Sequence, residues 1–172
     1  MSKPLVAVLM GSISDLPTMA EAVRVLREFD VPCETLVSSA HRSAQRTARY
    51  VRRAPGRGIR IFIAGAGGAA HLAGVVAAGT TLPVIGVPMN SDLAGLDSLL
   101  STAQMPAGVP VATVAVGKPG ARNAAYLAVA ILALSDRKLA DRLARHRASL
   151  AAGVEAASKR VPSELAKLLS GP

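Results

Sequence analysis

The chain is poor in cysteine, aromatic residues and charge, and each scarcity excludes a class of protein. Its 172 residues include one cysteine, no tryptophan and only 2% aromatic residues. The single cysteine, Cys33, excludes an internal disulfide and any metal site built from several cysteines, and its apolar neighbours predict an inert buried thiol. Charged residues make up 18% of the chain and hydrophobic residues 51%. That balance excludes intrinsic disorder and leaves alanine, valine and leucine to fill the core.

Membrane and targeting segments are also missing from the sequence. The longest apolar run, residues 124–134, is shorter than the roughly 20 residues that span a bilayer. The first residues lack the pattern of a signal peptide. We therefore expect a cytoplasmic protein with no membrane partner. The length predicts a single domain over residues 1–172, with an α/β core at about 4–134 and C-terminal helices at about 136–169.

The charge is strongly positive, at +9. Such an excess is typical of proteins that bind nucleic acids or anionic ligands. The basic residues, however, are spread over residues 46–60 and 137–160, without the interleaved aromatic side chains that stack on bases. We interpret most of them as solvated helix faces and expect no nucleic-acid partner. A non-catalytic module that binds phosphorylated ligands or nucleic acid stays a distant alternative.

Five short apolar segments alternate with helical patterns. Residues 5–10 form a continuous apolar run, typical of a strand that is buried on both faces of a parallel sheet. Strands that alternate with helices predict right-handed βαβ units. The predicted fold is therefore an α/β, three-layer, doubly wound parallel sheet of flavodoxin-like type, with about five strands and a C-terminal helical extension. The other four predicted strands are 33–37, 59–64, 83–87 and 110–116.

The predicted helices near the C-terminus point to an assembly of several copies. Residues 121–134 are apolar almost all round, which predicts a helix that is buried on every side. A chain of this size offers few places to enclose such a helix, so we expect a homo-oligomer. Two amphipathic helices, 136–150 and 154–169, are predicted to pack on the core or on a neighbouring subunit.

Polar residues follow four of the predicted strands, at the edge where parallel α/β sheets bind their ligands. Serine hydroxyls and free N–H groups at helix N-termini form an anion site, and the fork of Arg42 suits phosphate. Asp15 is suited to accept hydrogen bonds from sugar hydroxyls. His41, between small residues and an arginine, is suited to shuttle protons near neutral pH. The loops concerned are 11–15, 38–42, 65–71 and 88–91.

The glycines of the third loop, Gly67 and Gly68, allow a flat ligand to approach the backbone closely. The four loops together predict a pocket for a phosphorylated sugar with a flat, reactive head. The glycine run matches neither the P-loop nor the dinucleotide fingerprint, so ATP and NAD lack support. We expect no cofactor. Two isolated histidines without a third spaced ligand predict no metal site.

Several of these residues have simpler interpretations. Ser14 or Asp15 would serve only as a helix cap in one alternative. In another, the glycine run only lets a strand and a helix pack closely. His71 is equally well explained as a core histidine that bonds to backbone, and we interpret His146, on a helix far from the loops, as structural.

A set of motifs in these loops and beyond them resembles a known family. The motifs are GSISD at 11–15, SAHR at 39–42, AGAGGAAHL at 64–72, LDSLLS at 96–101, QMP at 104–106, GVPV at 108–111, and GA with NAA at 120–125. Their order and length resemble the N5-carboxyaminoimidazole ribonucleotide mutases of purine biosynthesis, the PurE family, over about residues 4–150. The intact glycine segment resembles the mutase class rather than the class that carboxylates aminoimidazole ribonucleotide with free carbon dioxide.

The resemblance implies a cofactor-free isomerisation, in which carboxylate moves from N5 to ring carbon C4 by decarboxylation and recarboxylation. His41 is then the general acid and base. The resemblance also implies an octamer, and functional coupling to the synthetase that makes the substrate. By position, the resemblance assigns the phosphate to Ser14, Ser39 and Arg42, and the ribose to Asp15. It places the carboxylate and carbon dioxide against Ser12 and the backbone of Ala66, Gly67 and Gly68. It places the base against His71 and Leu72.

The chain departs from the family pattern at two places. Ala44 and Ala73 stand where the family commonly has proline, which predicts looser loops. These changes bear on rate and affinity more than on the type of reaction. The nearest alternative function is carboxylation of aminoimidazole ribonucleotide by free carbon dioxide, and the preferred substrate distinguishes the two.

Overall fold

The computed structural model describes residues 3–170. They form two compact units, one that ends at Ile131 and one that begins at Leu132. The first unit holds a sheet with its helices, and the second holds one long helix. That all 172 residues form a single domain stays a prediction. Within residues 3–170, none of the helices is long and apolar enough to cross a membrane.

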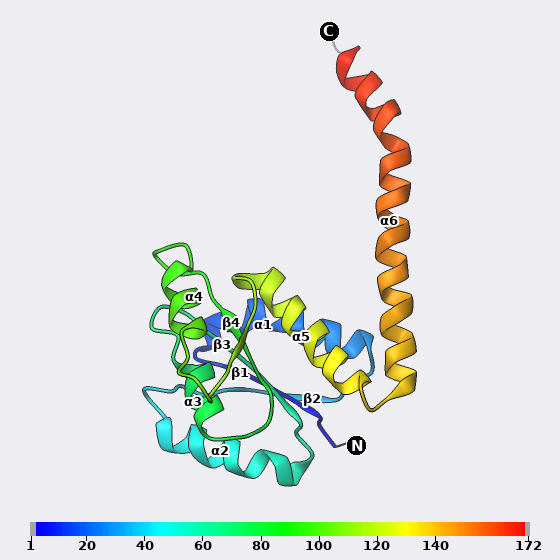
Figure 1. Ribbon diagram of the computed structural model, residues 1–172. Helices are drawn as coiled ribbons and strands as arrows, with labels where there is room; N and C mark the ends of the chain where they lie inside the picture. The colour runs from blue at the N-terminus through cyan, green and yellow to red at the C-terminus, as the bar shows by residue number, and fades with distance from the viewer. Residues whose placement is uncertain (1–2, 171–172) are drawn as a thin grey trace. The chain divides into compact units, whose positions relative to one another are not determined.

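Five parallel strands form the sheet of the first unit, in the order β2-β1-β3-β4-β5 (Figure 1). The central strands are almost wholly buried, as expected for apolar runs that are covered on both faces. The predicted doubly wound α/β sheet is confirmed, and its first four strands lie within two residues of the predicted positions. The strands are β1 (Val6–Met10), β2 (Cys33–Val37), β3 (Ile61–Ala66), β4 (Val84–Pro88) and β5 (Ala112–Thr113).

At the two edges of the sheet, the length of β5 and the burial of Cys33 differ from the prediction, since each edge strand pairs with a single neighbour. A strand over 110–116 was expected, but β5 comprises two residues, and beyond it the Val114 N–H donates to Gly86 O at 3.1 Å. On the opposite edge, Cys33 of β2 is half-buried instead of buried. Partial burial raises the pKa of the Cys33 thiol, and the positive charge of Arg27 opposes that rise only in part. The raised pKa keeps the thiol protonated and so supports the prediction that it is inert.

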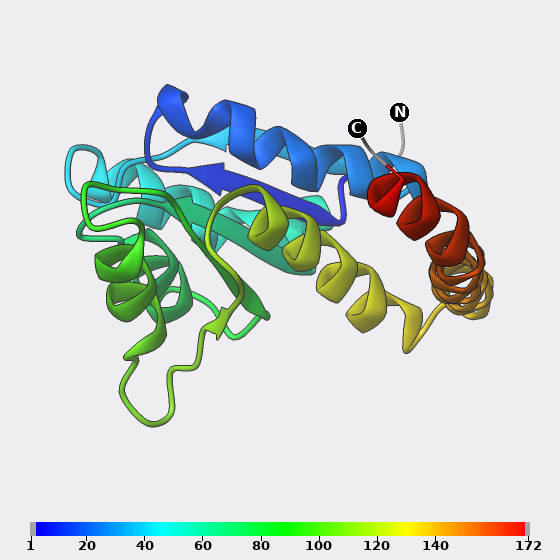
Figure 2. The same ribbon diagram turned by 90° about the horizontal axis from the view of Figure 1, so that it is seen from above.

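Helices cover both faces of the sheet (Figure 2). On one face, α2 (Ala44–Arg57) and α3 (Leu72–Ala78) pack on alternate strand residues such as Leu9 and Phe62. On the other face, Met19 lies so close to β3 that a Cβ at Gly65 would be 2.6 Å from its sulfur. The other elements of this unit are the 3-10 helix η1 (Ile13–Asp15), α1 (Leu16–Glu28), α4 (Leu96–Ala103) and α5 (Gly117–Ala133).

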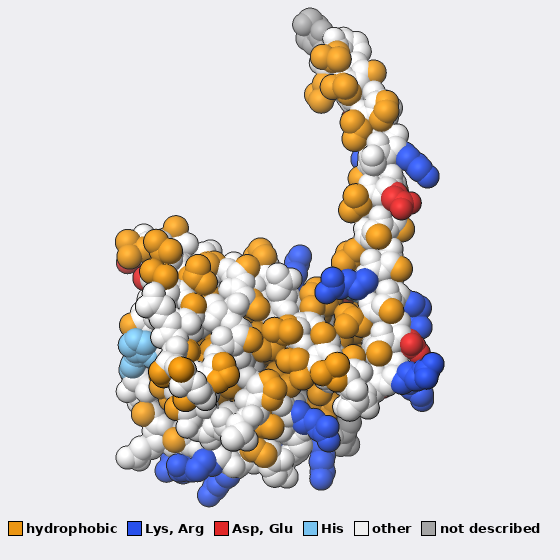
Figure 3. Space-filling view, in the orientation of Figure 1, with side chains coloured by type: hydrophobic (Ala, Val, Ile, Leu, Met, Phe, Trp, Pro, Cys, Tyr) orange, Lys and Arg blue, Asp and Glu red, His pale blue; other side chains and the backbone are white. Residues whose placement is uncertain are grey.

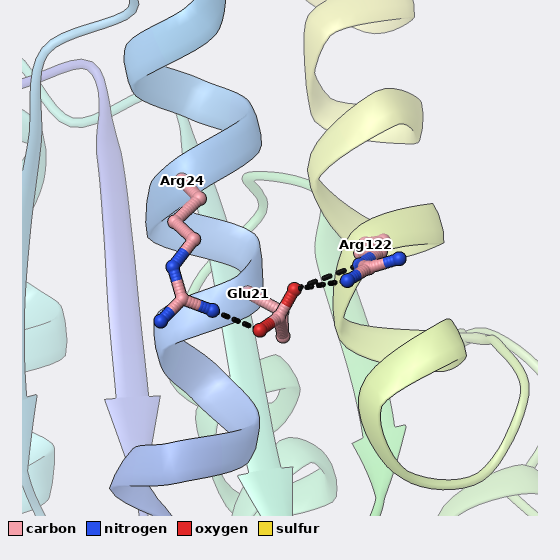
Figure 4. A network of polar contacts seen from close by, with 3 residues as sticks. All are labelled: Glu21, Arg24 and Arg122. Atoms are coloured by element: carbon pink, nitrogen blue, oxygen red, sulfur yellow. Dashed lines mark hydrogen bonds and ion pairs between the residues drawn. The ribbon is translucent and has the colours of Figure 1, made fainter.

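An ion-pair network joins α1 to α5. The buried Glu21 accepts hydrogen bonds from the guanidinium of Arg122 at 2.7 Å and also pairs with Arg24 (Figure 4). Nearby, the rings of Phe29 and Tyr126 pack edge to face, with centroids 6.0 Å apart. Because the Arg122 hydrogen bonds favour the carboxylate, they hold the pKa of Glu21 below its ordinary value.

In the single chain the helix at 121–134 is buried along one face only, so its burial on every side stays a prediction for the assembled protein. In α5, Arg122 and Asn123 are exposed, and Leu127 and Ile131 are only half-buried. Small side chains allow the helix to lie close to its neighbours along one face, and the polar residues occupy another. The buried face consists of Ala121, Ala124, Ala125, Ala128 and Val129.

The helix α2 continues past a proline. It runs through Pro55 and ends where Gly58 adopts the left-handed conformation (φ 109°). A proline in the last turn removes a single hydrogen bond, so the helix ends only at the glycine.

The C-terminal unit contains one helix, α6 (Arg137–Leu169), instead of the two predicted helices. Gly153 lies between the predicted pair, and a glycine inside a helix costs only about 1 kcal/mol relative to alanine. That cost does not interrupt a helix of 33 residues. Asp136 caps its start by accepting the Leu139 N–H at 3.1 Å.

Candidate functional site

A cavity of about 410 Å³ lies at the carboxyl ends of β1, β2 and β3. It is lined by the loops that the sequence analysis singled out after these three strands. Every predicted site residue lines it except Gly68. The lining residues are Gly11, Ser12, Ser14, Asp15, Ser39, Ala40, His41, Arg42, Ala66, Gly67, Ala69, His71 and Leu72.

The loop after β1 presents two serines and an aspartate to the cavity. Ser12 caps η1: its hydroxyl accepts the Ser14 N–H at 3.3 Å and the Ser14 O–H at 2.9 Å. In return, Asp15 Oδ2 accepts the Ser12 N–H at 3.1 Å. Partial burial raises the pKa of Asp15, and the Ser12 N–H opposes that rise. The alternative in which Ser14 or Asp15 serves only as a cap is not what the structure shows. The cap of η1 is Ser12, Asp15 makes no side-chain cap bond to α1, and all three residues line the cavity.

The loop after β2 is a turn held by its own hydroxyl groups. The Arg42 N–H donates to Ser39 Oγ at 3.1 Å, and the Ser43 O–H donates to Ser39 O at 3.0 Å. Beneath the turn, Ser38 and Thr47 share a buried hydrogen bond of 2.7 Å. These bonds hold the backbone on either side of the imidazole at position 41.

Arg42 connects two of the loops. Its guanidinium donates to Gly11 O at 3.4 Å, across the cavity from its own turn. The residue is exposed. The remaining N–H groups of the guanidinium fork are therefore in a position to meet an anion in the cavity.

The glycine loop after β3 is supported from α4. Gly68 adopts the left-handed conformation (φ 63°), its N–H donates to Ser98 Oγ at 2.9 Å, and its carbonyl accepts from Ser101 Oγ at 3.1 Å. A Cβ at Gly67 would lie 3.3 Å from Met89 Cβ. Glycine is therefore favoured at position 68 by the backbone conformation and at position 67 by the close packing of Met89.

Sequence reasoning assigned no role to Ser98 or Ser101. Both serines belong to the motif at 96–101, which marked this segment as part of the family pattern. The motif did not show that they hold the glycine loop. The loop after β4, expected to line the pocket, does not do so. Ser91 instead bonds to the Asp97 carboxylate and accepts the Gly95 N–H at 3.0 Å, which fixes the start of α4. The Ser91 hydrogen bond lowers the pKa of Asp97.

The two histidines of the cavity are hydrogen-bonded to each other. His41 Nε2 lies 2.8 Å from His71 Nδ1, and the two rings are nearly perpendicular, at 87°. Both side chains are exposed to the cavity, and imidazole side chains are visible at the molecular surface (Figure 3). His71 is therefore not the core histidine of the alternative interpretation.

The site shows no grouping of three metal-ligating side chains, and the rest of residues 3–170 shows none either. Its charged groups are the Arg42 guanidinium and the Asp15 carboxylate. The hydroxyls and the guanidinium are suited to bind an anion, and the carboxylate is suited to accept hydrogen bonds from hydroxyl groups. The two imidazoles are suited to transfer a proton.

Comparison with known proteins supports the resemblance drawn from the motifs. The family model for AIR carboxylase (AIRC) matches residues 5–152. A curated N5-carboxyaminoimidazole ribonucleotide mutase from Pyrococcus horikoshii is 52% identical over 160 residues, which cover 92% of this chain and 89% of that protein. One from Synechocystis is 56% identical over 148 residues, covering 86% and 83% respectively. The crystal structure of Treponema denticola PurE, 29% identical, matches with a TM-score of 0.83 over 91% of this chain and 98% of that one.

Proposed function

Because the chain belongs to the AIR carboxylase family, we propose that it is a mutase of purine (IMP) biosynthesis. It converts N5-carboxyaminoimidazole ribonucleotide into 4-carboxy-5-aminoimidazole ribonucleotide. Curated relatives more than half identical carry the mutase name, which supports this reaction over other chemistries of the fold. The observation that carries the proposal is the gathering, in one cavity, of an imidazole, an anion-binding loop pair and a glycine loop.

The substrate's phosphate is held by Ser14, Ser39 and Arg42. The first two supply hydroxyl groups from separate loops, and the guanidinium supplies a fork of donors. The ribose hydroxyls donate to Asp15, whose Oδ2 already accepts the Ser12 N–H and whose Oδ1 faces the sugar in this proposal. Partial burial, which raises the pKa of Asp15, strengthens hydrogen bonds from neutral donors because water competes less.

The reacting end of the substrate lies between His41 and the glycine loop. Breaking the N5–carboxylate bond releases carbon dioxide and leaves its electron pair on N5, which takes a proton from His41. C4 then attacks the carbon dioxide, and His41 removes the proton from C4, so that the imidazole returns to its starting form. No oxidant, reductant or nucleotide cofactor is needed for this balance.

Enclosure of the carbon dioxide is the second requirement. Ser12 and the backbone of Ala66 and Gly67 surround it, and His71 with Leu72 lines the pocket for the base. Gly68, also expected here, instead bonds to α4 and holds the loop. A captured molecule reacts as part of the same complex, at an effective concentration far above that of dissolved carbon dioxide. A non-enclosing pocket would release it, and the reaction would then depend on bicarbonate.

The proposal is tested by following product formation from N5-carboxyaminoimidazole ribonucleotide, generated in situ, without ATP or metal. Wild type converts it rapidly. His41→Asn loses about 10²–10⁴-fold in kcat, the usual contribution of a general acid and base, and still binds the ribonucleotide. Activity with aminoimidazole ribonucleotide and bicarbonate alone would instead identify the carboxylase alternative. A folded protein that binds the ribonucleotide but converts neither substrate would contradict both enzymatic functions.

We further propose that the protein works in the cytoplasm as a homo-oligomer, with eight subunits as the family resemblance implies. Apolar side chains along α6 support an assembly, since several of them are more than half exposed in the single chain (Figure 3). Functional coupling to the synthetase that makes the substrate stays a prediction. The residues that support the assembly are Leu150, Val154, Val161, Leu165 and Leu168.

A further inference from the structure

The hydrogen bond between the two cavity histidines constrains their protons. His41 Nε2 and His71 Nδ1 are 2.8 Å apart, so one proton lies between them and only one of the two rings donates it. With that bond intact, the pair carries at most three N–H protons, which is one imidazolium and one neutral ring. The direction of this hydrogen bond therefore fixes which nitrogen carries the proton in each neutral ring.

We propose that His71 is a positioning residue for His41, an inference that rests on the proposed mutase function. His71 Nδ1 accepts the Nε2–H proton of His41 and holds its own proton on Nε2. This arrangement leaves Nδ1 of His41 as the nitrogen that exchanges a proton with the substrate. When His41 becomes an imidazolium, the same hydrogen bond stabilises it, because a charged donor strengthens the bond.

The backbone around each ring supports this division of roles. His71 lies directly before α3, where its carbonyl accepts the Val75 N–H at 2.9 Å and the next residue, Leu72, is buried. His41 lies at the tip of a turn, and its own ring is exposed. The imidazole on the packed helix start is therefore suited to orient the imidazole on the turn.

Two charged groups line the same cavity, and neither substitutes for His71. Asp15 is engaged with its own loop through the Ser12 N–H, and Arg42 has no acceptor to offer an imidazole N–H. The hydrogen bond that the structure gives to the His41 ring comes from His71. A positioning role for His71 thus fills a need that the carboxylate of a catalytic triad fills elsewhere.

Two variants of nearly equal shape separate positioning from substrate contact. His71→Asn keeps a carbonyl acceptor near the place of Nδ1, and His71→Leu removes it. We expect His71→Leu to lower kcat about 10- to 100-fold, as the loss of partners of other functional histidines does, with KM changed by less than about threefold. His71→Asn should recover most of the lost kcat. Equal losses in both variants, or a raised KM at unchanged kcat, would show that His71 only lines the base pocket.

The tautomers are measured directly by solid-state ¹⁵N NMR of histidine-labelled, substrate-free protein, since the chain has only three histidines. We expect Nε2–H on both cavity histidines, and a change of the His41 signals in His71→Leu. An Nδ1–H proton on His71 would overturn the proposal. Because the spectrum needs no substrate, it stands even if wild type fails to convert N5-carboxyaminoimidazole ribonucleotide, an outcome that would overturn the proposed function instead.

Discussion

At the scale of single residues, the site depends on side chains whose loops are fixed by local hydrogen bonds. The Ser39 turn and the Ser12 cap hold their backbones without using all the polar groups that face the cavity. Arg42 is the residue through which the two loops meet. In the proposed phosphate site, we therefore expect loss of the guanidinium to affect substrate affinity more than the chemical steps.

Arg42→Lys tests this reasoning with the positive charge retained. Lysine is a point charge and cannot present the fork of donors that matches a phosphate. We expect KM to rise about tenfold and kcat to stay within about threefold, the pattern of a lost ground-state contact. Steady-state kinetics at constant ionic strength measure it, and Arg53→Lys, on the exposed part of α2, is the matched control. An unchanged KM would exclude Arg42 from the phosphate site.

At the scale of elements, α4 is a support for the glycine loop. Ser98 is fully buried, and its hydroxyl accepts the Gly68 N–H. The start of α4 is in turn fixed by Ser91. A chain of hydrogen bonds thus connects the loop after β4 to the wall of the cavity, although that loop does not reach the cavity itself.

Ser98→Ala leaves the half-buried Gly68 N–H without its acceptor, and loss of a typical hydrogen bond costs about 0.5–1.5 kcal/mol of unfolding free energy. We expect a lower urea midpoint and a reduced kcat, since the left-handed glycine loses the bond that holds it. Ser149→Ala on α6 removes an exposed hydroxyl that bonds to its own helix and should change neither quantity. Wild-type kcat in a measurably destabilised Ser98→Ala protein would show that the loop does not need α4.

The ion pair between α1 and α5 makes stability depend on pH. The pKa of Glu21 is lowered in the folded state, so its stabilisation is fully present above the unfolded-state pKa of about 4.3. It is lost as pH falls through the lower, folded-state value. We therefore expect Glu21→Gln to lower the urea midpoint at pH 7, with the difference from wild type shrinking towards pH 3. Glu155→Gln, exposed on α6, should show no such trend, and a pH-independent difference for Glu21→Gln would contradict the ion-pair explanation.

Sequence patterns were sufficient for the sheet and for most of the cavity lining, because both follow from local rules. Apolar runs mark buried strands, and the carboxyl ends of parallel strands meet at one edge. The 2.8 Å contact of His41 with His71, residues 30 apart, depends on three-dimensional register that no local pattern contains. The same is true of Ser98 beneath Gly68. The single α6 helix escaped prediction because glycine weakens a helix without always ending it.

At the scale of the whole molecule, the single chain leaves apolar surface that an assembly would bury. The side chains of α6 named above recur at spacings of three, four and seven residues, which is typical of a helix face that packs on another helix. Aliphatic side chains each contribute about 1.5–3 kcal/mol when fully buried. Charges placed on this face should therefore weaken an assembly that uses it.

Light scattering coupled to size exclusion tests the assembly. Eight copies of the 17.5 kDa chain have a mass of about 140 kDa, and this is the result that we expect for wild type. The double variant Leu165→Glu, Leu168→Glu should yield smaller species. Ser163→Glu adds a charge to the opposite, exposed side of α6 without removing an apolar side chain and is the control. A wild-type monomer would contradict the proposed oligomer.

The most direct test of the account is the fate of the transferred carboxylate. N5-carboxyaminoimidazole ribonucleotide labelled with ¹³C in that group is converted in a large excess of unlabelled bicarbonate, and the label is measured in the product by mass spectrometry. If the cavity beside His41 encloses the released carbon dioxide, most of the product keeps ¹³C. A product that carries the unlabelled carbon of the solution would contradict intramolecular transfer and would identify a carboxylase that uses free carbon dioxide.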